Sequence, residues 1–241
     1  MLKSRICIAF FAFAVGCAPA QKPLTDYVNP MLGTATLWDS VDLGFKPTKR
    51  TWGAEVFPGS SLPNAMVQVS PVTKFHSGAG YQYEDSVIYG FTHTNKGHWN
   101  LCHIPLLPVT GTPTPGDYCS PFSHERESAA PGYYQVFLDR YGVDAQLSST
   151  LRCAFHKYTY PAGAAASLLA DLQRSNEHVR AWDIRKEGDN VFAGWQQTGE
   201  KMYFYAVANR PVTGIEPVVE GDREVRIVRF GEGDGALELR I

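Results

Sequence analysis

The residues of this chain that could do chemistry gather in one stretch, residues 80–111. Aromatic and imidazole side chains are dense there: Tyr81, Tyr83, Tyr89, Phe91, His93, His98, Trp99 and His103. Within the stretch, two strand-like runs flank a polar loop at residues 94–100, and loops carried by a rigid scaffold are where binding groups tend to lie. An aromatic ring packs on the C–H groups of a sugar while imidazoles and amides fix its hydroxyls. The stretch therefore predicts a carbohydrate-contacting loop.

Six residues of this region are the predicted substrate contacts: Trp99, Tyr81, His98, His93, Asn95 and Asn100. Each also has a structural interpretation. Trp99 could anchor the loop on the core, and His93 and Asn95 could simply brace it. Other aromatic side chains are assigned to the core, among them Tyr133, Tyr134, Phe155 and Tyr158.

A transition-metal site is another possible use of these residue types, because imidazole and thiolate are suitable zinc ligands. The candidates are His93, His98, Cys102, His103, Cys119 and His124. None of them has the tight spacing of a zinc knuckle, and Cys102 next to His103 on a strand would not readily face one ion. Packed or hydrogen-bonded histidines are the default interpretation, so no metal ligand is assigned.

The first twenty residues have the pattern of an export signal. Lys3 and Arg5 precede an apolar run at residues 6–15, which is too short to span a bilayer as a helix. Ala18-Pro19-Ala20 offers a cleavage site, and Cys17 offers a rival site at which the chain would be lipid-anchored. Both alternatives predict export, to the periplasm, the medium or the outer membrane.

Cleavage after Ala20 leaves three cysteines, Cys102, Cys119 and Cys153. An odd count in an exported protein allows one disulfide and one spare thiol. A bond between Cys102 and Cys119 would close a short loop.

Composition favours one globular β domain and gives no reason to expect a nucleic acid as partner. The chain has 241 residues, of which 44% are hydrophobic, and its net charge is −2 from 22 basic and 24 acidic residues. A near-neutral chain has no electrostatic footprint for nucleic acid or an anionic membrane surface. The 22 Gly and 16 Pro punctuate many short runs, which is typical of a sandwich.

The strand-like runs follow each other closely, and no long run has helical periodicity. In residues 143–151, Val143, Ala145, Leu147 and Leu151 mark one face, as in a half-buried antiparallel strand. Residues 25–34 are expected to form a short strand ending in a turn. The other expected strands are residues 65–69, 87–93, 104–110, 133–138, 155–160, 167–172, 179–184, 191–197, 201–208, 225–230 and 236–241. Residues 21–241 are thus predicted to form one all-β domain of two packed antiparallel sheets.

Seven passages, in order along nearly the whole mature chain, resemble the N-terminal domain of glycoside hydrolase family 92. They are D-Y-V-N-P-M-L-G-T (26–34), F-P-G-S-S-L-P (57–63), Y-G-F-T-H-T (89–94), L-P-V-T-G (107–111), S-P-F-S-H-E (120–125), P-G-Y-Y-Q-V-F-L-D (131–139) and R-C-A-F-H-K-Y-T-Y-P (152–161). The resemblance implies a supersandwich-like β-sandwich from a calcium-dependent, inverting exo-α-mannosidase of bacteria, acting on mannose-containing glycans such as N-glycans or mannan.

The resemblance also implies a limit. In the family a larger (α/α)6 barrel follows the sandwich and carries the catalytic acid, the base and most calcium ligands. This sequence stops at Ile241, where the sandwich is expected to end, so the catalytic barrel is expected to be absent and the chain alone inactive. Its expected partners are a mannose-containing glycan and the separate catalytic domain.

Carboxylates within the chain do not supply a catalytic pair. Inversion at a glycosidic bond needs two carboxyl groups about 6.5–9.5 Å apart. Glu84 with Asp85 and Glu125 with Glu127 are the local candidates. Glu84 and Asp85 are adjacent, and adjacent residues on a strand point to opposite faces, so they cannot easily form such a pair. Solvated loop carboxylates are the favoured interpretation, and no acid or base is assigned.

Three functions therefore compete. The first is the N-terminal sandwich of a family 92 mannosidase, and the second is a free-standing carbohydrate-binding module with the same sugar-facing loops. The third is an unrelated metalloenzyme that uses the His/Cys cluster.

Overall fold

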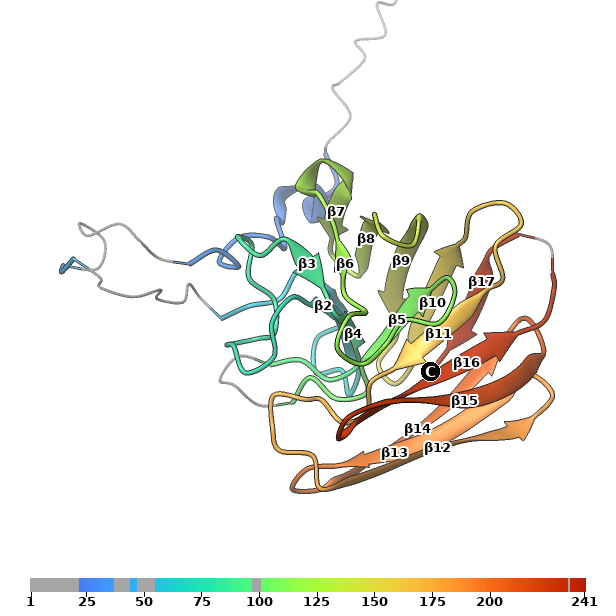
Figure 1. Ribbon diagram of the computed structural model, residues 1–241. Helices are drawn as coiled ribbons and strands as arrows, with labels where there is room; N and C mark the ends of the chain where they lie inside the picture. Colours follow the sequence, from blue (N-terminus) through green and yellow to red (C-terminus); the bar gives the residue numbers. More distant parts are fainter. Residues whose placement is uncertain (1–21, 37–43, 47–54, 97–100, 234) are drawn as a thin grey trace, which may run out of the picture.

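The computed structural model describes residues 22–36, 44–46, 55–96, 101–233 and 235–241. Within these residues the chain is almost entirely antiparallel β structure, in two large sheets and a two-stranded one (Figure 1). Two short 3-10 helices, η1 (Leu24–Tyr27) and η2 (His124–Arg126), are the helical elements of this part of the chain. None of the described helices is long and apolar enough to cross a membrane.

The first sheet has seven strands in the order β1-β2-β4-β5-β11-β16-β15. Their bounds are β1 (Ser60–Ser61), β2 (Gln68–Val72), β4 (Gly90–Thr92), β5 (Leu106–Val109), β11 (Ser167–Ala170), β16 (Arg223–Phe230) and β15 (Val212–Glu220). The second sheet has eight strands in the order β12-β13-β14-β17-β10-β9-β8-β7. Their bounds are β12 (Ala181–Gly188), β13 (Val191–Gln197), β14 (Lys201–Ala208), β17 (Leu237–Arg240), β10 (Ala154–Thr159), β9 (Val143–Ser149), β8 (Tyr133–Leu138) and β7 (Glu127–Ala130). Strands β3 (Val87–Ile88) and β6 (Ser120–Pro121) pair separately.

The predicted two-sheet β-sandwich is confirmed, and alternation along the strands explains the packing. In β8, β9 and β10, buried residues alternate with half-exposed ones, so each strand turns one face to the core. Phe91 of the first sheet packs against Tyr134 and Tyr158 of the second, with ring centroids 6.5 and 6.1 Å apart. Aromatic contacts of this kind join the two sheets through the core.

Several expected details were wrong at the ends of elements. In residues 25–34 the expected turn is present at residues 30–33, but η1 takes the place of the expected strand. Leu151 lies beyond the end of β9 and is exposed. Tyr133 and Phe155, assigned to the core, are half-buried because they face away from their buried neighbours Tyr134 and Ala154.

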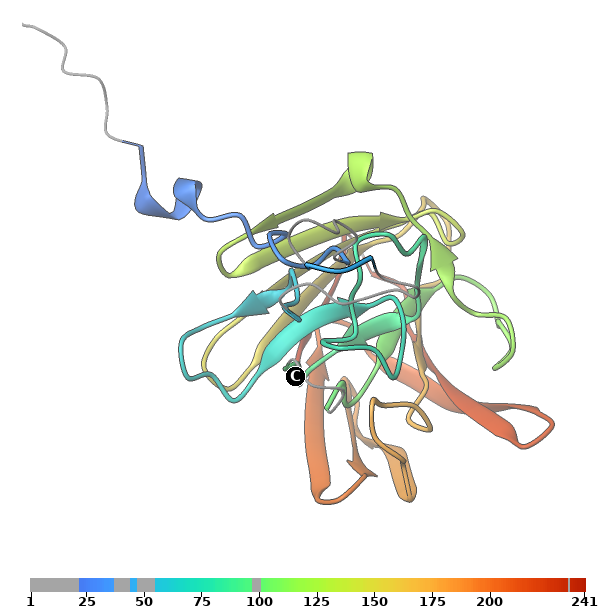
Figure 2. The ribbon, with the colours of Figure 1, turned by 90° about the vertical axis from the view of Figure 1, so that its left-hand side faces the viewer.

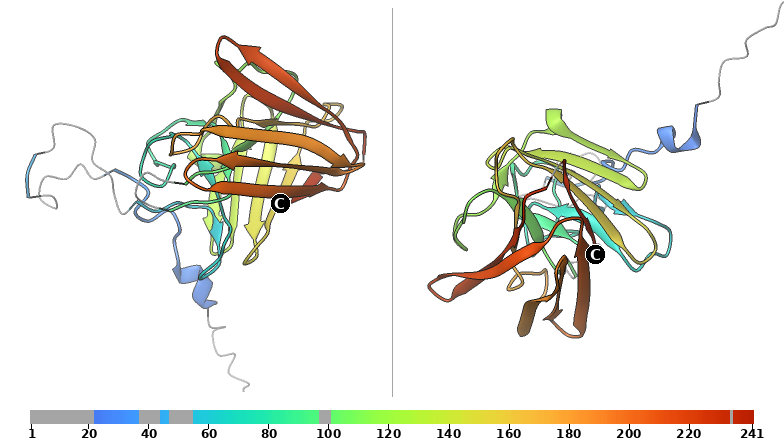
Figure 3. Two further views of the ribbon diagram at one scale, coloured as in Figure 1. Left: turned by 90° about the horizontal axis from the view of Figure 1, so that it is seen from below. Right: turned by 90° about the vertical axis from the view of Figure 1, so that its right-hand side faces the viewer.

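Figures 2 and 3 show two features that matter for the site. The β15–β16 hairpin projects from the body of the sandwich (Figure 2). The end of the chain, marked C, lies beside the orange-brown strands of the second sheet in the left view of Figure 3.

Candidate functional site

The central loop between β4 and β5 is closed at its base by backbone hydrogen bonds. The N–H of Cys102 donates to the carbonyl of Thr94 over 2.7 Å, and the N–H of His93 donates to the carbonyl of His103 over 3.0 Å. The His103 N–H also donates to the Thr94 hydroxyl oxygen at 3.1 Å. The loop therefore leaves and re-enters the sheet at a fixed point.

The backbone at this base is strained. Leu101, Cys102 and Ile104 have φ angles of 65°, 57° and 57°, in the left-handed region that side chains other than Gly disfavour. Strain of this kind gathers at functional sites and persists where the surroundings impose it. Here the imposing contact is Gln196 of β13, whose Oε1 accepts a 2.8 Å hydrogen bond from the N–H of Ile104.

Three predicted substrate contacts, Tyr81, His93 and Asn95, are buried side chains with hydrogen-bond partners. The Nδ2 of Asn95 donates to the carbonyl of Gln68 over 2.6 Å, and its Oδ1 accepts from the Thr92 hydroxyl over 2.9 Å. These contacts support the bracing role weighed for His93 and Asn95. Direct sugar contact by any of the three stays a prediction.

Both ring nitrogens of His93 take part in hydrogen bonds. Its Nδ1 is 2.8 Å from the carbonyl oxygen of Ile104, and its Nε2 is 3.0 Å from Nε2 of His156. A carbonyl only accepts, so Nδ1 of His93 carries the proton and its Nε2 accepts from His156. The hydroxyl of Tyr158 then donates to Nδ1 of His156 over 2.6 Å. Burial lowers the pKa of His93 to about 4 and that of His156 well below its usual value, which keeps both rings neutral.

The Tyr81 hydroxyl contacts the buried carboxylate of Glu127. The Tyr81 hydroxyl is 3.0 Å from both carboxylate oxygens of Glu127, and the Tyr134 hydroxyl donates to the same group over 2.6 Å. His124 Nδ1 approaches Oε2 of Glu127 at 2.5 Å. Interpreting Glu127 as a solvated loop carboxylate was therefore wrong: it is a buried acceptor that joins β7 to the beginning of the central stretch, residues 80–111.

The other candidates fall into three groups. Trp99, His98 and Asn100 lie outside the described residues, so their roles stay predictions. The expected disulfide is absent: Cys102, Cys119 and Cys153 are free thiols, and Cys102 is buried with its Sγ 3.5 Å from Oδ1 of Asn95. Among the described residues, no three His, Cys, Asp or Glu side chains come together as a metal-binding group.

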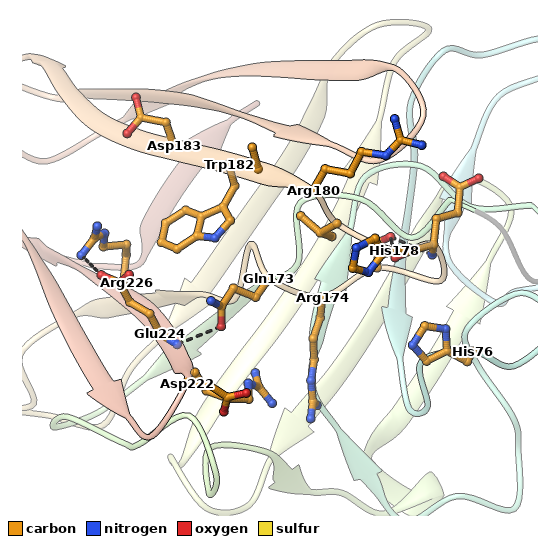
Figure 4. Close-up of a pocket in the computed structure, with 15 residues that line it drawn as sticks. His76, Gln173, Arg174, His178, Arg180, Trp182, Asp183, Asp222, Glu224 and Arg226 are labelled. Atoms are coloured by element: carbon orange, nitrogen blue, oxygen red, sulfur yellow. Dashed lines mark hydrogen bonds and ion pairs between the residues drawn. The ribbon is translucent and has the colours of Figure 1, made fainter.

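Beside the loop base lies a polar groove of about 760 Å³, which the sequence did not predict (Figure 4). One wall is the segment that leads from β11 into β12, and the other is the end of the β15–β16 hairpin. Its residues are His76, Gln173, Arg174, Ser175, Glu177, His178, Val179, Arg180, Ala181, Trp182, Asp183, Asp222, Arg223, Glu224 and Arg226.

The groove is physically connected to the central loop. Glu177 Oε2 accepts a hydrogen bond from the Thr198 hydroxyl over 2.9 Å and lies 3.4 Å from Nε2 of His103. Burial lowers the pKa of His103, and the nearby Glu177 carboxylate opposes that shift. The N–H of Asn176 also donates to the carbonyl of Leu101 over 2.9 Å. One wall of the groove therefore stands on the strained loop base.

Most charges in the groove are already paired. Asp171, beneath the groove, binds Arg223 at 2.5 Å and lies 3.7 Å from Arg174. The carboxylate of Glu224 pairs with the guanidinium of Arg226, which in turn lies over the Trp182 ring at 5.2 Å.

Arg180 and Asp222 make no side-chain hydrogen bond or ion pair with the described residues. Figure 4 shows Arg180 and Trp182 on one wall and Asp222 on the other. The groove therefore offers a free donor, a free acceptor and an aromatic ring, which is the chemistry that neutral polyhydroxyl compounds require. The signal in the sequence was Trp182 flanked by charged residues in R-A-W-D (180–183), but only the fold brings Asp222 opposite.

Comparison with known proteins gives the family. The model of the glycosyl hydrolase family 92 N-terminal domain matches residues 27–234. The chain belongs to this family. No match was found among curated proteins.

Solved family 92 structures share the fold. The alpha-mannosidase BT3965 from Bacteroides thetaiotaomicron superposes with a TM-score of 0.77 at 23% identity, covering 91% of this chain and 33% of that one. The inverting mannosidase BT2199 from the same organism gives 0.71 at 22% identity, covering 91% and 32%. The glycosyl hydrolase ccman5 gives 0.62 at 25% identity, covering 76% and 30%. The family 92 domain described here thus spans about a third of these relatives.

Proposed function

We propose that this family 92 domain is the glycan-facing part of an exported exo-α-mannosidase that acts on mannose-containing glycans, N-glycans or mannan. The observation that carries the proposal is the match to the family model over residues 27–234. Two relatives are described as mannosidases, and BT3965 has also been solved with mannoimidazole. The reaction itself is assigned to the part of the family 92 relatives that this domain does not cover.

The polar groove is the proposed contact surface for the glycan. Trp182 supplies a ring face, the Arg180 guanidinium donates to sugar hydroxyls, and the Asp222 carboxylate accepts from them. Mannose is neutral, so a free cation opposite a free anion suits it better than a surface of one sign. Trp99, His98 and Asn100 stay proposed contacts for the glycan.

Calcium is the cofactor that the family resemblance implies. The described His, Cys, Asp and Glu side chains do not form a metal-binding group, so they do not fit a calcium site. No role on this chain is assigned to the ion.

Export is the proposed destination. Residues 1–20 carry the leader pattern, with Ala20 or Cys17 defining the mature N-terminus. Mass spectrometry of the mature protein from its native host tests this. A mature chain starting at Gln21 or at lipidated Cys17 supports export, and an uncleaved Met1 in the cytoplasm contradicts it.

Glycan binding by the groove is tested on the whole chain by titration with α-mannobiose, followed through the tryptophan indole NMR signals. The Trp182 signal is expected to shift and to saturate. Trp182→Ala is expected to weaken binding roughly tenfold or more, as for the loss of a large aromatic contact. Trp195→Ala is the matched control, because Trp195 lies on β13 outside the groove. Equal affinities of the two variants for α-mannobiose would contradict glycan binding in the groove.

The same titration separates the free-standing carbohydrate-binding module from the mannosidase domain. A module that works alone is expected to bind the sugar tightly without another domain. An edge subsite of a larger active site is expected to bind the isolated disaccharide weakly, at about millimolar concentration.

A further inference from the structure

His76 brings an imidazole nitrogen with a free lone pair into the polar groove. Its Nδ1 is 3.0 Å from the backbone carbonyl oxygen of Asn176. A carbonyl oxygen only accepts, so Nδ1 carries the proton and Nε2 keeps its lone pair. Among the described residues, none donates a hydrogen bond to this Nε2, and His76 is exposed and lines the groove. The groove therefore holds a second free acceptor besides Asp222.

Asn176 fixes the His76 ring through two hydrogen bonds. Besides the bond from Nδ1, the N–H of His76 donates to Oδ1 of Asn176 over 2.8 Å. His76 has a φ angle of 58°, in the left-handed region that few side chains adopt, and these two bonds maintain it. Asn176 itself is 5% exposed, and its Nδ2 donates to the carbonyl of Gly78 over 3.4 Å. A ring held in this way loses little side-chain freedom when a ligand binds.

His76 reaches the groove from an element that belongs to neither wall. It lies in the segment between β2 and β3, whereas the walls come from the segment before β12 and from the β15–β16 hairpin. In Figure 4, His76 is on the right, Trp182 and Asp222 are on the left, and Arg174 lies between them in this view. A few polar groups that converge on one cavity are typical of a small-molecule site.

The free nitrogen of His76 selects for neutral donor groups. A sugar hydroxyl can donate to it, whereas a carboxylate or a phosphate dianion brings no proton. A metal ion is the other partner of a free imidazole, but it needs several ligands. The described His, Cys, Asp and Glu side chains form no group of three that could hold one. The chemistry of His76 therefore matches a neutral sugar.

We propose that His76 determines which sugars the groove accepts, by receiving a hydrogen bond at Nε2 from one hydroxyl of the bound glycan. The inference rests on the proposed glycan contact in the groove and adds a specificity-determining residue to it. A sugar that lacks this hydroxyl leaves the oriented acceptor without a donor and therefore binds less tightly.

Imidazole nitrogen NMR on the whole chain gives the first test, at about pH 8, where a free imidazole is neutral. Without sugar, His76 is expected to carry its proton on Nδ1, and its signals are assigned by their loss in His76→Asn. On titration with α-mannobiose, the Nε2 signal is expected to shift and to saturate together with the Trp182 indole signal. A proton on Nε2, or an unchanged Nε2 signal while Trp182 saturates, overturns the proposal and leaves the groove intact. No shift of either signal overturns glycan binding in the groove and the His76 contact together.

The affinity of a variant gives the second test. Asn tolerates a left-handed φ angle, so His76→Asn removes the imidazole without adding backbone strain. This variant is expected to bind α-mannobiose roughly threefold to tenfold more weakly than wild type, as for the loss of one hydrogen bond. Lys74→Asn is the matched control, because Lys74 is exposed two residues earlier and lies outside the groove. Equal affinities of the two variants overturn the proposal.

Analogues of α-mannobiose that each lack one hydroxyl of the terminal mannose identify the partner of Nε2. Wild type is expected to bind one analogue roughly threefold to tenfold more weakly than the parent sugar. His76→Asn is expected to bind that analogue and the parent sugar equally, because the acceptor of the missing hydroxyl is already gone. If every analogue loses the same affinity in both proteins, His76 receives no sugar hydroxyl and the proposal is wrong.

Discussion

His93 and His156 face each other across the core with their Nε2 atoms 3.0 Å apart, so a single hydrogen bond between imidazoles joins the two sheets. His93 follows β4 of the first sheet, and His156 lies in the middle of β10 of the second. Tyr158 and the carbonyl of Ile104 complete the chain of hydrogen bonds at either end. The pair is bonded to Ile104 at the base of the central loop, so it fixes that base relative to both sheets.

The His93–His156 pair is expected to lower the free energy of unfolding at acidic pH. The pKa values of His93 and His156 are lowered in the folded chain. Below about pH 6.5 the unfolded chain therefore binds protons that the folded chain does not bind. The shift of His93 from 6.5 to about 4 corresponds to roughly 3 kcal/mol, fully present above pH 6.5 and lost as the pH falls towards 4. Urea unfolding between pH 7 and 4.5 measures it.

The control for this experiment is another histidine. His178→Gln, at an exposed position in the groove, is expected to keep the wild-type pH profile, whereas His93→Gln/His156→Gln is expected to flatten it. Identical pH profiles for all three proteins would show that the imidazole pair does not couple to folding.

Removing the buried carboxylate is expected to cost much more than removing its exposed neighbour. Glu127→Ala leaves the hydroxyls of Tyr81 and Tyr134 buried without their acceptor, at about 1–3 kcal/mol each. Glu125→Ala, two residues earlier on the exposed η2, is expected to change stability by about 0.5 kcal/mol or less. Thermal unfolding measures both, and equal losses would contradict the role given to Glu127.

The turn before Tyr81 tolerates only glycine. Gly80 has φ +88°, and a Cβ there would lie 2.7 Å from Sγ of Cys102. Gly132 has φ +78° and nothing within 4 Å of such a Cβ, so Gly132→Ala measures the backbone strain alone. Gly80→Ala is expected to lose about 1–3 kcal/mol more, from overpacking against the loop base. Equal urea midpoints would show that the turn and loop are not packed together.

The cysteines are expected to behave as unequal free thiols. Burial raises the pKa of Cys102 to about 12, while Cys119 and Cys153 are half-buried. A thiol-reactive dye is expected to label Cys119 and Cys153 in the native chain and Cys102 only on unfolding. A reducing agent is expected to leave the melting temperature unchanged; a drop would reveal a disulfide.

How well each strand could be predicted from the sequence depended on where that strand lies in its sheet. The bounds of β8, β13 and β14 match the predicted ranges, because inner strands with a buried face keep their pattern. The missed strands, β1, β6, β7 and β15, all lie at the edge of a sheet. β15 carries Pro217 and is mostly exposed, both of which an edge tolerates and an inner strand does not.

The candidate site could be predicted from the sequence only in part, for a related reason. Residues 80–111 identified the loop by composition, and the buried positions of Tyr81, His93 and Asn95 became visible only with the fold. The groove needs Trp182 and Asp222, which are on different sheets. Their proximity comes from strand order, which no local pattern in the sequence contains.

The central claim, that the groove supplies glycan contact to a mannosidase, is tested most directly by steady-state kinetics on α-mannobiose. The whole chain, joined after Ile241 to the part of BT3965 outside the match, is assayed with calcium present as wild type, Trp182→Ala and Trp195→Ala. The account predicts that Trp182→Ala lowers kcat/KM roughly tenfold to a hundredfold, about 1–3 kcal/mol of lost contact, while Trp195→Ala stays near wild type. An unchanged kcat/KM in a folded Trp182→Ala protein would contradict the claim.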